Sequence, residues 1–133
     1  MKRKILFLAL AAGLAWFGGL VLAHGEDIDP AKAEEFIRKP ETFLLDVRTQ
    51  KEFSAGHIKG AHLIPVQELK ERWNELPKDA ATPIVVYCTV GVRSLRAHRA
   101  LKLGGYKNVF NLKGGINAWT ATGHAVTAPH AER

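Results

Sequence analysis

Short apolar runs alternate with helix-like patterns along most of the chain. Four runs are typical of buried strands: 43–47, 61–64, 84–87 and 109–112. The run at 84–87 (Ile-Val-Val-Tyr) is mostly β-branched and uncharged, as expected of a central strand. Because strands that alternate with helices form parallel sheets covered on both faces, the pattern predicts one α/β domain.

Helical patterns separate these runs. Asp29 and Pro30 are typical of a helix start, because an aspartate side chain caps the first free N–H groups and proline suits the first helical position. Pro40 then ends this helix. Three further helices are expected: over 65–77, where Leu69, Trp73 and Leu76 recur at helical spacing; over 94–103; and after the glycine pair at 114–115.

The two ends of the chain depart from this alternation. Three basic residues at 2–4 precede an apolar run over 5–22 and Ala23, a pattern typical of a signal peptide cleaved after Ala23. The alternative is a retained membrane anchor, because a run of this length just spans a bilayer. We expect export to the periplasm, free or anchored to the outer face of the inner membrane. The tail over 123–133 has few apolar residues and is expected to be disordered.

The charge of the chain excludes some classes of partner. Without residues 1–23, 16 basic and 13 acidic residues remain, a formal charge of +3. This weak and dispersed charge favours small anionic substrates slightly and does not predict nucleic-acid binding. A membrane contact is expected only if the leader is retained. The histidines lack metal-ligand spacing, so no metal site is predicted.

The chain has a single cysteine, Cys88, directly after the strand at 84–87. Exported proteins normally pair their cysteines in disulfides, and Cys88 has no partner in the chain. It is therefore either an inert core residue or a reactive thiol. Ligands of open α/β sheets bind outside the carboxyl ends of the strands, where Cys88 is expected to lie. We favour the reactive thiol.

The residues after Cys88 suit an anion-binding loop: Thr89, Val90, Gly91, Val92 and Arg93. Their backbone N–H groups and the start of the following helix can point at one sulfur atom. Glycine permits the positive φ that such a loop needs, and arginine adds a positive charge. An ordinary cysteine, with a pKa of about 8.5, is only about 3% thiolate at pH 7. The loop would increase that fraction.

Three segments make the chain resemble the rhodanese family: 44–61, which contains Asp46, Arg48 and His57; the loop CTVGVRS at 88–94; and 105–119 with its Gly-Gly-Ile-Asn-Ala-Trp motif. The resemblance covers nearly all of residues 24–122, which we predict to form one rhodanese-like domain. It implies a three-layer sandwich, with a roughly five-stranded parallel sheet between helices on both faces.

The resemblance implies that the chain is a thiosulfate sulfurtransferase. Cys88 would attack the outer sulfur of a donor such as thiosulfate, and a nucleophilic acceptor such as cyanide or a thiol would remove the sulfur from the resulting persulfide. The backbone of 89–93 would hold this sulfur, and no cofactor is needed. Asp46 and Arg48 match the family's first signature, and a structural role is favoured for both. His57 is also expected to be structural, because the thiolate needs no general base.

Two other functions stay open. A persulfide relay, or sulfur-carrier binding module, would use the same Cys88 with a protein donor. A related phosphatase or arsenate reductase would need a wider loop, because a tetrahedral oxyanion brings three oxygens to the N–H groups. Residues 88–93 form a six-residue loop, and the resemblance implies that related phosphatases have one residue more. The length therefore favours sulfur transfer.

Overall fold

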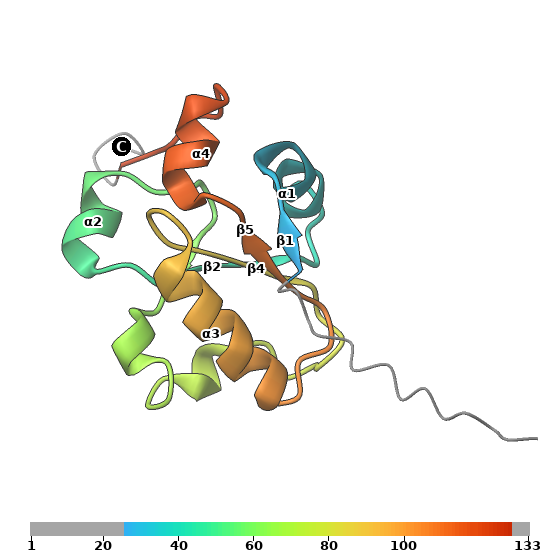
Figure 1. Ribbon diagram of the computed structural model, residues 1–133. Coiled ribbons are helices and arrows are strands. Elements are labelled where there is room, and N and C mark those ends of the chain that lie inside the picture. Colours follow the sequence, from blue (N-terminus) through green and yellow to red (C-terminus); the bar gives the residue numbers. More distant parts are fainter. Residues whose placement is uncertain (1–25, 129–133) are drawn as a thin grey trace, which may run out of the picture.

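The computed structural model describes residues 26–128, and five parallel strands form a single sheet in the order β1-β5-β4-β2-β3 (Figure 1). Three strands are four residues long: β2 (Phe43–Asp46), β4 (Ile84–Tyr87) and β5 (Val109–Leu112). The edge strands β1 (Asp27–Ile28) and β3 (His62–Leu63) have two residues each. The predicted five-stranded parallel α/β sheet is confirmed.

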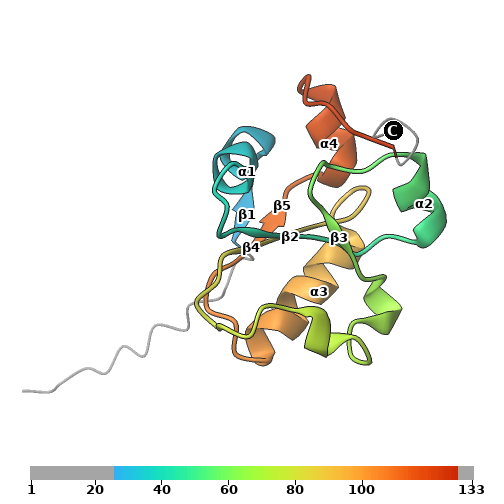
Figure 2. The ribbon, with the colours of Figure 1, turned by 180° about the vertical axis from the view of Figure 1, so that it is seen from behind.

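Helices cover both faces of the sheet, as the two opposite views show (Figures 1 and 2). The helices are α1 (Pro30–Ile37), α2 (Gln50–Ala55), α3 (Val92–Leu103) and α4 (Gly115–Ala121). In β4, Ile84 and Val86 pack on the α3 side, whereas Val85 and Tyr87 pack on the side of α1 and α4. This alternation follows from the two-residue period of a strand and gives the domain two apolar layers.

The region between β3 and β4 differs from its prediction. Instead of one α-helix over 65–77, it forms two 3₁₀ helices, η1 (Val66–Glu68) and η2 (Trp73–Glu75). Leu69 and Leu76 are nevertheless buried in the core, as their spacing predicts. Short tight turns bring both leucines to the sheet, so tertiary packing overrides the helical pattern.

Helix α2 was not predicted, although the sequence carries a signal for it. Thr49 accepts a hydrogen bond from the Glu52 N–H, and the Glu52 carboxylate accepts one from the Thr49 N–H. This reciprocal pair is a capping box, and the letters T-x-x-E at 49–52 are its signature. The two-residue strand β1 was also missed, because its length leaves no periodic pattern to detect.

The two ends of the chain are described in part. Residues 1–23, with the predicted leader, and residues 129–133 lie outside the described residues. Residues 123–128 make defined contacts instead of the expected disorder: Thr127 forms an antiparallel bridge with His57, and the Trp119 Nε1–H donates to the Ala125 carbonyl. Backbone pairing of this kind needs no apolar pattern. Between residues 26 and 128 no helix has the length and apolar character needed to cross a membrane.

Candidate active site

Cys88 lies directly after β4, between the carboxyl ends of β2 and β5. Its side chain belongs to the core, with 1% of the residue exposed. The chain then turns through Gly91, whose φ of 110° lies in the left-handed region, and α3 begins at Val92. Glycine adopts this conformation at little cost, so Gly91 allows the chain to turn from strand to helix around the sulfur.

The loop directs hydrogen-bond donors at the sulfur of Cys88. The Gly91 N–H donates to Sγ at 3.1 Å, and the Ser94 Oγ lies 3.4 Å from it. Burial by itself would raise the pKa of Cys88, but hydrogen bonds from the Ser94 hydroxyl and from the N–H groups of Ser94, Gly91 and Val90 outweigh it. The pKa of the thiol is therefore below its ordinary value, which favours the nucleophilic thiolate.

Helix α4 fixes the orientation of this loop. The Ile116 N–H donates to the Cys88 carbonyl at 2.9 Å, and the Asn117 N–H donates to the Thr89 carbonyl at 3.2 Å. In a trans peptide the carbonyl and the following N–H point in opposite directions, so the Val90 N–H turns toward the sulfur when the Thr89 carbonyl turns toward α4. The contacts to α4 therefore aim the loop's donors inward.

This contact requires a glycine at 115. A Cβ at Gly115 would overlap the carbonyl oxygens of both Cys88 and Thr89, and its φ of 61° is left-handed. Only a residue without a side chain lets the start of α4 approach the loop so closely. The Gly114-Gly115 pair, predicted only as a turn, is thus part of the support of the active site.

Arg93 was predicted to place a positive charge beside the sulfur, and the structure adds a partner to it. Its guanidinium forms a two-pronged ion pair with Glu52, with Nη1–Oε1 at 2.7 Å and Nη2–Oε2 at 2.9 Å. Thr89 joins this group by donating to Glu52 and accepting from Arg93. The pKa of Arg93 is raised chiefly by Glu52 and to a smaller extent by Cys88. Arg93 is therefore near the sulfur, with much of its charge balanced by Glu52.

Asp46 and Arg48 form a buried ion pair, with 2.7 Å between Arg48 Nη2 and Asp46 Oδ2. The remaining hydrogen bonds of the Arg48 guanidinium go to the carbonyl oxygens of Glu52, in the first turn of α2, and of Gly56, which follows the last residue of α2. The pair therefore holds α2, and with it Glu52, against the sheet. These contacts agree with the structural role favoured for both residues from the sequence, which stays a prediction.

His57 also has structural contacts. Its ring stacks on Phe53 at 3.7 Å between centroids, and Nδ1 lies 2.9 Å from the Phe53 carbonyl. In the part of the chain that the structure describes, no three His, Cys, Asp or Glu side chains gather as they would around a metal ion.

Sequence analysis missed three supporting residues of this site. Glu52 forms an ion pair with Arg93, and Ser94 contacts the sulfur. Gly115 has no side chain and so lets α4 approach the loop closely. The T-x-x-E signature at 49–52 is a signal for α2 but not for the ion pair. Ser94 ends the CTVGVRS motif, and no role was predicted for it. Of the predicted loop residues 89–93, Val90 and Gly91 direct N–H groups at the sulfur, and Arg93 lies near it.

Comparisons with known proteins agree with this geometry. The family model described as a rhodanese-like domain matches residues 29–122. An uncharacterized protein of Bacillus subtilis, YqhL, is 46% identical over 122 residues, covering 90% of this chain and 94% of its own length. A sulfurtransferase of Allochromatium vinosum is 39% identical over 89 residues, covering 67% of this chain and 81% of its own.

The fold agrees as well. The crystal structure of a rhodanese-related protein from Thermoplasma volcanium superposes with a TM-score of 0.69 at 33% identity, covering 77% of this chain and 97% of that one. The family model spans Cys88, its loop and the helices that support it, and the chain therefore belongs to the rhodanese-like domain family.

Proposed function

We propose that the protein is a thiosulfate sulfurtransferase that carries a sulfane sulfur on Cys88. The observation that carries the proposal is the hydrogen bond from the Gly91 N–H to Cys88 Sγ inside a six-residue loop whose contacts lower the pKa of the thiol. Such a loop binds negative sulfur before and after transfer, so one set of donors serves both halves of a two-step reaction.

In the first step the Cys88 thiolate attacks the outer sulfur of thiosulfate. A bond forms between Sγ and that sulfur, the sulfur–sulfur bond of thiosulfate breaks, and sulfite leaves with the electron pair. In the second step cyanide or a thiolate attacks the outer sulfur of the persulfide, the Sγ–sulfur bond breaks, and the Cys88 thiolate returns. The loop's N–H groups stabilise the negative charge that forms on sulfur.

The small space around the buried sulfur of Cys88 favours sulfur transfer over phosphate chemistry. Only 1% of Cys88 is exposed, so a terminal sulfur can approach Sγ more easily than a tetrahedral phosphate with three oxygens. The sulfonate end of thiosulfate can stay at the mouth of the loop. We expect negligible hydrolysis of phenyl phosphates.

A persulfide relay with a protein donor is a second candidate. Val90 and Val92 flank Gly91 and are 57% and 71% exposed. Apolar side chains at the mouth of a reactive loop suit contact with another protein. In both cases we propose that the protein works in the periplasm.

The mass of the intact protein tests the proposal directly. We expect the protein to gain one sulfur atom from thiosulfate and to lose it to cyanide. Cys88→Ala should keep the fold and gain nothing. Loading by a protein persulfide but not by thiosulfate would favour the relay, and Cys88-dependent phosphatase activity would overturn both.

A further inference from the structure

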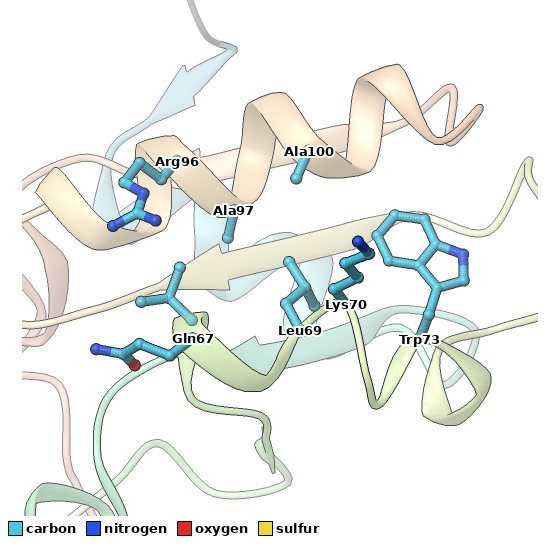
Figure 3. A pocket seen from close by; sticks show the side chains of 8 residues that line it. Gln67, Leu69, Lys70, Trp73, Arg96, Ala97 and Ala100 are labelled. Carbon is cyan, nitrogen blue, oxygen red and sulfur yellow. The ribbon is translucent and has the colours of Figure 1, made fainter.

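A groove of about 480 Å³ lies between α3 and the segment that carries η1 and η2. Eight residues line it: Val66, Gln67, Leu69, Lys70, Trp73, Arg96, Ala97 and Ala100. Figure 3 shows Arg96 and Gln67 at the end toward which β4 points, and Trp73 at the opposite end. The volume is typical of small-molecule sites.

Small residues on one face of α3 keep this groove open. Ala97 and Ala100 line it, and Gly104 follows one turn later on the same face. A Cβ at Gly104 would overlap the ring of Trp73. The absence of a side chain at 104 therefore lets the indole lie against the helix and form the end wall of the groove.

The groove combines this apolar surface with two positive charges. Lys70 and Arg96 lie on its rim and are both exposed. Within residues 26–128 neither side chain forms a hydrogen bond or an ion pair, and no carboxylate lines the groove. Arg93, one turn before Arg96, is already paired with Glu52. The two rim charges are thus available to an anion.

We propose that this groove binds a small organic anion, with its aromatic or alkyl body against Trp73 and Leu69 and its acidic group at Lys70 and Arg96. Indole and leucine surfaces favour an apolar body, and two unpaired cations on the rim favour a negative group and disfavour a positive one. A groove of this size suits one ring system better than an extended protein segment.

The site is separate from the sulfur-binding loop in its chemistry. The loop binds sulfur through backbone N–H groups and the Ser94 hydroxyl, whereas the groove offers side-chain charge and apolar area. The two share a packed layer, since Val66, Leu69, Ala97 and Cys88 belong to one core cluster. Binding in the groove does not require the thiol.

Titration with 2-naphthoate, followed by calorimetry and by amide chemical shifts, tests the proposal. We expect saturable 1:1 binding with shifts centred on Trp73 and Ala100, and weaker binding of the uncharged 2-naphthamide. Ala100→Leu fills the groove at an exposed position and should abolish binding. Arg96→Gln and Lys70→Gln should each weaken it by up to about fivefold, as expected for an exposed charge pair.

Arg99→Gln is the matched control, because it removes the same charge from an exposed position of α3 outside the groove. This variant should bind 2-naphthoate as the unaltered protein does. Cys88→Ala should also bind normally, which separates this proposal from sulfur transfer. Lack of saturable binding, equal loss in Arg99→Gln, or shifts centred on residues 89–93 would overturn the proposal.

Discussion

The Arg93 guanidinium is bound by the carboxylate of Glu52, which lies 41 residues earlier in the chain, through two hydrogen bonds of 2.7 and 2.9 Å. The side chains are 31% and 32% exposed, so the pair stands at the edge of the site where water can reach it. The pKa of Glu52 is held well below its usual range, first by Arg93. The charge beside Cys88 is therefore set by two residues together.

Removing Arg93 and removing Glu52 should shift the pKa of Cys88 in opposite directions. Arg93→Ala leaves the negative charge of Glu52 without its partner, so the pKa of Cys88 should rise. Glu52→Gln leaves the positive charge of Arg93 without its partner, so the pKa of Cys88 should fall. The alkylation rate of Cys88 by iodoacetamide at neutral pH should change by up to about fivefold. The double variant should return toward the unaltered protein, and identical pH profiles in all four proteins would refute this coupling.

Ser94→Ala should raise the pKa of Cys88, because the hydroxyl is the strongest of the contacts that lower it. Cys88 is mainly thiolate at pH values above its pKa and becomes protonated as the pH falls through that pKa. In Ser94→Ala this loss should begin at a higher pH, with sulfur loading at pH 7 slower by about fivefold, the value of one hydrogen bond. Ser54→Ala, at an exposed position of α2, should leave the profile unchanged.

Gly115→Ala should slow sulfur loading as well as destabilise the protein. The Cβ of the introduced alanine would push the carbonyl groups of Cys88 and Thr89 away from α4. The N–H groups of the loop would then point away from the sulfur. Gly105→Ala is the control, since Gly105 also has a positive φ of 103° but no atom lies within 4 Å of the added Cβ. We expect about 1 kcal/mol of lost stability in Gly105→Ala with normal loading. Equal loading in both variants would contradict this role of Gly115.

Asp46→Ala should lower the free energy of unfolding by about 3–5 kcal/mol, because it leaves the buried Arg48 without its carboxylate. Urea denaturation measures this loss. The exposed pair of Lys32 and Glu35 offers a comparison, and Lys32→Ala should cost less than about 1 kcal/mol. A loss this small in Asp46→Ala would show that the pair does not hold α2 to the sheet.

Elements with a clear local pattern could be predicted from the sequence. The buried strands β2, β4 and β5 are short apolar runs, and α1 begins at the aspartate and proline that the chain offers. In the segment 65–77 the leucines are buried as expected, but they lie in turns that the periodic pattern does not specify. The run over 61–64 likewise contains β3, whereas the two-residue β1 depends on pairing with β5, which no local pattern encodes.

The sequence by itself determined the chemistry of this protein: a single thiol at the carboxyl end of a central strand, followed by a glycine-containing loop and a helix start. Only the tertiary structure decided what controls that thiol. Glu52 and Gly115 reach the loop from α2 and α4, and residues distant in the chain meet according to how the helices pack on the sheet. Periodicity reports which face of an element is buried, whereas an ion pair or a close backbone approach depends on the position of two elements at once.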